Sequence, residues 1–155
     1  VLKLSIIALL AIIPYRLVSG GVHLKTHIGC IVGTSLFYVG SALLSKYIIL
    51  EPIYTKYILI AITWAFSMVM IKLYAPADTE NVPILRKKER KIKKNLSYII
   101  MTLTLLASIL IKDTVISNLL IFLTLFQTIW ISKLTYKLTN NKYGYEEYVK
   151  LKNVT

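Results

Sequence analysis

Three side chains that can do chemistry lie close together in a chain of 155 residues that holds no other histidine or cysteine. The segment 19–30 reads SGGVHLKTHIGC and carries His23, His27 and Cys30. A histidine can remove a thiol proton so that the thiolate attacks a carbonyl and forms an acyl-enzyme. The same side chains could instead bind zinc. They could also be interfacial histidines and a small apolar cysteine that only packs.

Spacing alone favours His27 as the partner of Cys30, because side chains three apart are neighbours on a helix. On one straight helix His23 and Cys30 would stand about 10.5 Å apart along the axis. A pairing with His23 therefore requires a break in the regular helix, for which Gly20 and Gly21 before His23 and Gly29 before Cys30 supply flexible backbone. A thiol in the first turn of the following helix would face the positive end of the helix dipole, which favours the thiolate.

The composition indicates that membrane-spanning helices position these residues. The chain is 56% hydrophobic and 17% charged, with a mean hydropathy of +0.65, which is too apolar for a soluble domain of this size. Five continuous apolar stretches approach the roughly 20 residues that a spanning helix needs. They cover residues 1–14, 28–45, 57–75, 96–111 and 115–132. We therefore expect an all-α, polytopic membrane protein with about five hydrophobic helices and a single domain over 1–155.

Basic residues predict how the chain crosses the membrane, since cytoplasmic loops are enriched in lysine and arginine. The segment 76–95 carries such a run: Arg86, Lys87, Lys88, Arg90, Lys91, Lys93 and Lys94. We expect this loop in the cytoplasm, together with the connection 15–27 and a tail 133–155 made of a short interfacial helix and a frayed end. The His/Cys cluster then faces the cytoplasm. This topology explains the net charge of +12 better than nucleic-acid binding does.

Two motifs resemble a known family. The pattern R-x3-GG-x-H-x6-C, from Arg16 to Cys30, resembles the signature of the accessory gene regulator protein B (AgrB) family of Gram-positive quorum sensing. The segment YAPADTENVPI, residues 74–84, is similar to that family's YAPADT-type loop and is also followed by a basic run. The order of hydrophobic segments agrees, so the resemblance covers nearly the whole chain. Family members usually begin with a further N-terminal segment, so we expect one to be missing before Val1.

The resemblance implies a multipass membrane cysteine endopeptidase that cuts a precursor peptide, AgrD, on the carboxyl side of the future signal. The family's nucleophile maps onto Cys30 and its histidine onto His23, not His27. Its required arginine and glycine map onto Arg16 and Gly21. The enzyme thioester would then be attacked by an internal cysteine of the precursor, which releases a cyclic thiolactone.

The expected partners follow from the same resemblance. They are an AgrD-like precursor, the bilayer and a second copy of the chain, in the plasma membrane of a Gram-positive bacterium and with no cofactor, metal or nucleic acid. The basic residues expected to contact an acidic precursor tail or anionic lipid are Arg86, Lys87 and Lys88, although a solvated loop that sets topology is the commoner role of such a run.

Several roles stay open at this point. Asp78 could orient His23 as a third catalytic member, or it could be a turn residue that caps the local backbone. Gly29 and Gly33 form a GxxxG pair, which serves either close packing or the backbone of the site. Two further functions compete with the peptidase: a zinc hydrolase that uses the two histidines and the cysteine, and a non-enzymatic peptide transporter.

Overall fold

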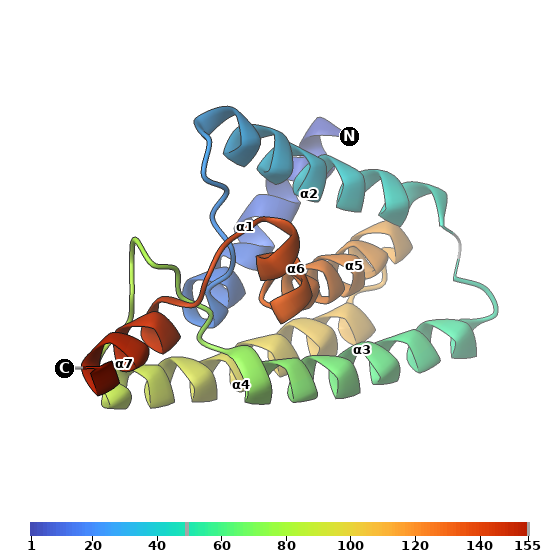
Figure 1. Ribbon diagram of the computed structural model, residues 1–155. Coiled ribbons are helices and arrows are strands. Elements are labelled where there is room, and N and C mark those ends of the chain that lie inside the picture. The colour runs from blue at the N-terminus through green and yellow to red at the C-terminus, as the bar shows by residue number, and fades with distance from the viewer. Residues whose placement is uncertain (49, 155) are drawn as a thin grey trace.

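The computed structural model describes residues 1–48 and 50–154, and over these residues the protein is all-helical (Figure 1). Five long helices form the body of the molecule, and two shorter helices make up its C-terminal part. In chain order they are α1 (Leu2–Ser19), α2 (His27–Tyr47), α3 (Ile53–Tyr74), α4 (Lys87–Leu110), α5 (Thr114–Trp130), α6 (Lys133–Leu138) and α7 (Gly144–Val154). The predicted all-α class is confirmed.

Each of the five apolar stretches lies in one of the long helices. Helices α1, α2 and α3 are long and apolar enough to cross a membrane, and α5, with 17 residues, is a shorter apolar helix. These elements support a membrane protein. The expectation of five spanning helices is not confirmed for the described residues, because the first half of α4 is charged.

Helix α4 begins within the basic run rather than after it. We expected a loop over 76–95, but the loop ends at Arg86 and the helix begins at Lys87. Lysine and arginine are good helix formers. Glu89 in the first turn suits the positive helix end and pairs with Lys93 one turn later, at 3.5 Å between Nζ and Oε1. The basic residues therefore form the first turns of α4.

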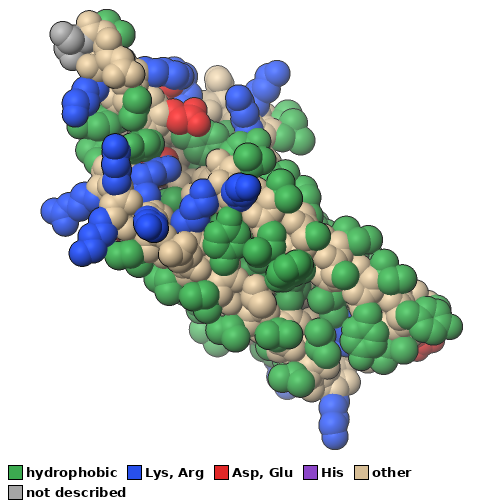
Figure 2. Space-filling view, turned by 90° about the horizontal axis from the view of Figure 1, so that it is seen from below, with side chains coloured by type: hydrophobic (Ala, Val, Ile, Leu, Met, Phe, Trp, Pro, Cys, Tyr) green, Lys and Arg blue, Asp and Glu red, His purple; other side chains and the backbone are tan. Residues whose placement is uncertain are grey.

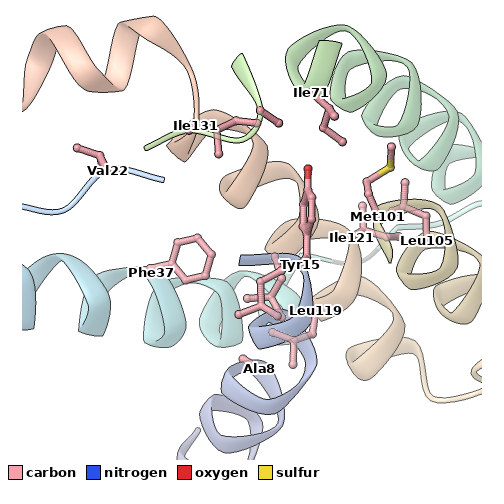
Figure 3. Packing of buried hydrophobic residues seen from close by; sticks show 14 of the residues in the cluster. Ala8, Tyr15, Val22, Phe37, Ile71, Met101, Leu105, Leu119, Ile121 and Ile131 are labelled. Atoms are coloured by element: carbon pink, nitrogen blue, oxygen red, sulfur yellow. The ribbon is translucent and has the colours of Figure 1, made fainter. Parts of the chain in front are cut away.

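Helix α5 runs through the middle of the long helices (Figure 1). Ten of its residues are buried, on all its sides, as expected for a helix surrounded by others. Figure 3 shows its Leu119 and Ile121 among core side chains from the other four long helices: Ala8, Tyr15, Phe37, Ile71, Met101 and Leu105. This central position explains how a short helix can organise the fold.

Hydroxyl groups connect α5 to its neighbours inside this core. The Thr128 hydroxyl donates to the Thr124 carbonyl at 2.8 Å, so its oxygen is free to accept from others. The Tyr15 hydroxyl lies 3.1 Å from it and the Ser67 hydroxyl 2.8 Å from it. Such interhelical hydrogen bonds are a usual way of joining helices in a membrane, where unpaired polar groups are costly.

The outer surface of α3 and α4 is largely apolar. Figure 2 shows hydrophobic side chains along this face, with lysine and arginine gathered toward one end. The exposed apolar residues of the two helices include Ile58, Ile62, Val69, Leu73, Ile99, Leu103 and Leu106. A continuous apolar surface of this kind suits contact with lipid.

The C-terminal tail is more ordered than the sequence predicts. Instead of one short helix and a frayed end, α6 and α7 fold back onto the loop that follows α3. The rings of Tyr136 and Tyr143 stack with centroids 4.0 Å apart, and Tyr143 also stacks on Tyr74 at 6.0 Å. Residue 155 lies outside the described residues. Stacked aromatic rings therefore fix the tail to the end of α3.

Candidate active site

Two motifs that are far apart in the sequence meet at the end of α1. Gly20 pairs with Ala77 of the YAPADT loop in an isolated parallel β-bridge. The Ala77 N–H donates to the Ser19 carbonyl at 2.8 Å, and the Gly21 N–H donates to the Ala77 carbonyl at 2.9 Å. A Cβ on Gly20, whose φ is 73°, would collide with the Ala77 carbonyl oxygen. The GG pair and the YAPADT loop therefore form one unit.

Gly21 faces helix α5. Its φ is 147°, and a Cβ there would lie 2.9 Å from Cδ1 of Trp130. Next to it, Nε2 of Gln127 donates to the Gly20 carbonyl at 2.7 Å and lies 3.1 Å from Oγ of Ser19. The glycine predicted from the family motif thus occupies a position with no room for a side chain.

A non-helical segment joins α1 and α2 and carries His23. Residues 20–26 contain no helix, and Thr26 caps α2 with its side chain, so that the helix begins at His27. The break that a His23 pairing requires therefore lies just before His27. Cys30 lies in the first turn of α2, as expected.

Cys30 is a free, half-buried cysteine. Its backbone N–H donates to the Thr26 carbonyl at 2.9 Å, which is the first hydrogen bond of the helix. The thiol therefore lies beside the positive end of the α2 dipole. Unpaired N–H groups at a helix start can also stabilise an oxyanion.

His23 is exposed and lines a cavity of about 390 Å³ at the end of α1. Arg16, Gly21 and Asp78, which the sequence also singled out, line the same cavity. Cys30 does not. Among the described residues the His23 imidazole and the Cys30 thiol form no hydrogen bond, so their pairing stays a prediction.

His27, the partner favoured by spacing, is exposed at the start of α2, one turn before Cys30. The zinc alternative needs both histidines and the cysteine as ligands. Within residues 1–48 and 50–154, no group of three His, Cys, Asp or Glu side chains is arranged to hold a metal ion. The structure therefore gives the zinc alternative no ligand cluster.

The GxxxG pair of α2 packs against the segment that carries His23. A Cβ on Gly33 would lie 2.8 Å from Cδ1 of Leu24, and one on Gly29 would lie 2.6 Å from Oγ1 of Thr26 and 3.7 Å from Cβ of Leu24. These glycines make room for the connection between α1 and α2, and Gly33 also lies against Trp130 at the end of α5.

Arg16 lies in the last turn of α1 beside two aromatic rings. Its Cζ is 6.0 Å from the ring centroid of Phe37 and 5.8 Å from that of Trp130. Its Nη1 is buried and has no hydrogen-bond partner within the described part of the chain. Arg16 also takes part in none of the ion pairs found there. The guanidinium is therefore held by rings and not by an anion.

Asp78 is, by contrast, surrounded by donors. Its buried Oδ2 accepts hydrogen bonds from Nη1 of Arg90 at 3.0 Å, from the Ile84 N–H at 2.9 Å and from the Tyr145 N–H at 3.0 Å. This is the turn-capping role that the sequence left open. Its Oδ1 is buried without a partner among the described residues. No hydrogen bond joins Asp78 to His23 in the same set.

Two tyrosines of the C-terminal tail lie next to the Asp78 loop and donate hydrogen bonds to backbone carbonyls. The Tyr136 hydroxyl donates to the Asp78 carbonyl at 2.9 Å, and the Tyr143 hydroxyl donates to the Ile131 carbonyl at 2.9 Å. Burial raises the pKa of Tyr136 above its usual value, with a further contribution from the Asp78 charge. Burial likewise raises the pKa of Tyr143. Both phenols therefore remain neutral donors.

The three basic residues expected to contact substrate or lipid are exposed: Arg86, Lys87 and Lys88. None has an ion-pair partner among the described residues, and none lines the His23 cavity. Lys94, further along α4, differs, because burial lowers its pKa, followed by the charges of Arg90 and Lys72. A contact of the exposed trio with substrate stays a prediction.

Sequence reasoning missed Phe37 and Trp130, the two aromatic residues beside Arg16. Trp130 also donates its Nε1–H to the Val22 carbonyl at 3.0 Å, next to His23. A tryptophan at the end of an apolar helix is usually assigned to the membrane interface. Nothing in the sequence pairs it with an arginine at the other end of the chain.

Residues 1–131 match the family model described as Accessory gene regulator B. The chain belongs to the AgrB family. The match covers α1 to α5 and both motifs of the site, whereas α6 and α7 lie beyond it.

Three curated relatives illustrate the similarity. An AgrB-like protein of Listeria monocytogenes serotype 4a (strain HCC23) is 30% identical over 134 residues, which cover 86% of this chain and 63% of that protein. One of Clostridium acetobutylicum (strain ATCC 824) is 30% identical over 142 residues, 92% of this chain and 66% of its own. One of Listeria welshimeri serovar 6b is 37% identical over 87 residues, 56% of this chain and 43% of its own.

This member of the AgrB family spans less than two thirds of the length of these relatives. No solved structure matches the chain.

Proposed function

We propose that this AgrB-family chain acts as a membrane cysteine endopeptidase in agr quorum sensing. It cleaves an AgrD-like precursor peptide through an acyl-enzyme and so prepares thiolactone formation. One observation carries the proposal: the only cysteine of the chain is a free thiol in the first turn of α2, directly after a non-helical segment that carries His23. The family match over 1–131 supports the same function.

The first step of the mechanism is acylation of the enzyme. His23 removes the proton of the Cys30 thiol, and the sulfur forms a bond to the carbonyl carbon of the scissile peptide while the carbonyl electrons move onto the oxygen. Backbone N–H groups at the start of α2 stabilise that oxyanion. When the carbonyl re-forms, the C–N bond breaks and His23 gives its proton to the leaving amine.

The second step is transfer of the acyl group within the precursor. An internal cysteine of the bound amino-terminal fragment attacks the thioester carbonyl, and Cys30 leaves as a thiolate, which takes the proton released by the attacking thiol. One thioester replaces another, so the exchange needs little free energy. Hydrolysis is the competing loss, and a site that excludes water limits it.

The mechanism requires the His23 imidazole to reach the sulfur in the complex with substrate. Catalytic hydrogen bonds often form fully only when the substrate is bound. His23 is exposed and lies on the non-helical segment 20–26, after the buried residues Gly21 and Val22. A change in this segment on substrate binding would bring the imidazole to Cys30 without disturbing α2.

The basic residues support a cytoplasmic site. Lysine and arginine gather toward one end of the molecule (Figure 2), and the positive-inside rule assigns such an end to the cytoplasm. In this proposal the protein lies in the plasma membrane of a Gram-positive bacterium, acts as a homodimer, and uses Arg86, Lys87 and Lys88 to attract an acidic part of the precursor.

Co-expression with the cognate precursor tests the proposal, with mass spectrometry of the peptide products. Cys30→Ala and His23→Ala should each abolish the cleaved product at unchanged protein level. His27→Ala is the matched control, because it removes an exposed histidine of the same segment, and it should retain cleavage. Continued cleavage by the Cys30→Ala variant would refute the peptidase, and loss with His27→Ala but not with His23→Ala would make His27 the base.

A further inference from the structure

Among the half-buried charged side chains of the described residues, Arg16 stands apart. Removing a guanidinium from water without a counter-ion is costly, and buried charges in proteins are normally paired. Nη1 of Arg16 is fully buried, yet it makes no hydrogen bond, and no carboxylate pairs with the group in the described chain. Among the described residues, Arg16 is therefore a half-buried cation without an anionic partner.

Two other charged side chains that line the cavity, Asp78 and Lys93, already form ion pairs. Asp78, the acid that lines the same cavity, directs its Oδ2 to Arg90 at 3.0 Å. Lys93, the second cation on the wall, pairs with Glu89 at 3.5 Å. Arg16 is thus the cationic group of this cavity that has no acidic partner within residues 1–48 and 50–154.

The residues around Arg16 favour the binding of an anion to its guanidinium. The rings of Phe37 and Trp130 attract the guanidinium through cation–π contacts and limit its rotation. The planar guanidinium presents several donors in a fixed fork, which matches the two oxygens of a carboxylate. A cation fixed in this way loses little conformational entropy when it binds an anion.

We propose that Arg16 is a carboxylate-binding residue of this cavity and holds an acidic side chain of the peptide substrate next to the scissile bond. The inference rests on the proposed peptidase function, because it makes the occupant of the cavity a peptide. Its position supports this occupant, since His23 lines the same cavity. The volume of about 390 Å³ accommodates an acidic side chain with part of its backbone.

The remainder of the cavity wall suits a peptide as well. Apolar side chains of α1 and of the loop before α4 line it, among them Ile13, Leu17 and Ile84. A peptide that carries apolar side chains next to an acidic one would bury the former against these residues and the latter against Arg16. The substrate class that we infer is therefore an amphipathic peptide with a carboxylate near the cleavage point.

The test combines substitutions of Arg16 in the enzyme with substitutions of acidic residues in the peptide. Wild type, Arg16→Lys and Arg16→Gln are each given the cognate precursor and versions in which single acidic residues near the cleavage site are replaced by the matching amide. For one of these positions the replacement should raise KM of the wild type about 30-fold, as expected for loss of one partner of a buried charge pair. The same replacement should have no further effect on Arg16→Gln, and Arg16→Lys should fall between.

Binding is measured separately from cleavage, so that failure of the peptidase proposal can be distinguished from failure of the proposal that Arg16 binds a carboxylate. The chain has two tryptophans, Trp64 and Trp130, and Trp130 lies beside Arg16. In the Trp64→Phe, Cys30→Ala protein, the fluorescence of Trp130 should respond to the acidic peptide at a concentration about 30-fold lower than to its amide version. This readout requires no turnover and no change to Arg16.

Three outcomes would overturn the inference. Equal responses to the acidic and amide peptides at every position would mean that no peptide carboxylate is bound. A fall in kcat of Arg16→Gln that is the same for all peptides would assign the guanidinium to charge formed during the reaction. A Trp130 response to phosphatidylglycerol vesicles, but not to the peptide, would assign the site to an anionic lipid.

Discussion

Two half-buried arginines at the same end of the molecule have different partners. Arg90 on α4 donates to Asp78, to the Ile84 carbonyl and to the Pro76 carbonyl, and its Cζ lies 4.3 Å from the ring centroid of Tyr145. Arg16 on α1 lies beside two aromatic rings and has a buried nitrogen without an acceptor among the described residues.

The two arginines therefore differ in role: Arg90 stabilises the fold, whereas we propose that Arg16 binds substrate. The contacts of Arg90 close the loop 75–86 and attach the C-terminal helices to it, so its charge is satisfied by the fold. Arg16 has no acidic partner among the described residues, and in our proposal a carboxylate of the substrate pairs with it. Changes at Arg90 are therefore expected to reduce stability, and changes at Arg16 to reduce activity.

The largest effect is expected at Gly20, where the end of α1 meets the loop 75–86. Gly20→Ala places a Cβ against the backbone oxygen of Ala77 at a residue with φ of 73°, which should cost about 4 kcal/mol in free energy of unfolding. Unfolding followed in detergent micelles measures this. Gly40→Ala is the control, because no atom lies within 4 Å of its added Cβ, and it should stay within about 1 kcal/mol of wild type.

The direct comparison of the two arginines should give a smaller but more informative difference. Arg90→Gln leaves the buried Asp78 carboxylate without its cation and should cost about 3 kcal/mol in free energy of unfolding. Arg16→Gln loses cation–π contacts but also removes an unpaired charge, so its cost should be below about 1 kcal/mol. Both values come from the same unfolding measurement. Equal losses in free energy of unfolding for the two substitutions would contradict the proposed difference between Arg90 and Arg16.

The smallest effect concerns the support of the Asp78 loop by the tail. Tyr136→Phe removes one hydrogen bond, from the hydroxyl to the Asp78 carbonyl, and should cost about 1 kcal/mol in free energy of unfolding. Tyr148→Phe changes an exposed tyrosine of α7 and should have no measurable effect. If the two variants unfold alike, the tail does not hold the loop through this hydroxyl.

The long helices could be predicted from the sequence because continuous apolar runs are a local signal. The five runs fall within α1 to α5, and the glycines before His23 correctly indicate a break in the helix there. The prediction of a loop over 76–95 places the start of α4 too late, because lysine and arginine are good helix formers and the helix begins at Lys87.

The contacts of the site could not be predicted in the same way. The bridge between Gly20 and Ala77, the rings beside Arg16 and the fold of α6 and α7 onto the Asp78 loop all join residues distant in the chain. Such contacts depend on which helices become neighbours, and periodicity carries no information about that. The family motifs do not indicate that Arg90 rather than His23 is the partner of Asp78.

One measurement tests the peptidase most directly: the intact mass of the protein after reaction with a precursor whose ring cysteine is replaced by alanine. This replacement blocks thioester exchange, so the acyl-enzyme should accumulate. We expect a mass increase equal to the amino-terminal fragment, located on Cys30 and removed by hydroxylamine. Cleavage of this precursor with no adduct on Cys30, or with an adduct on another residue, would contradict the account.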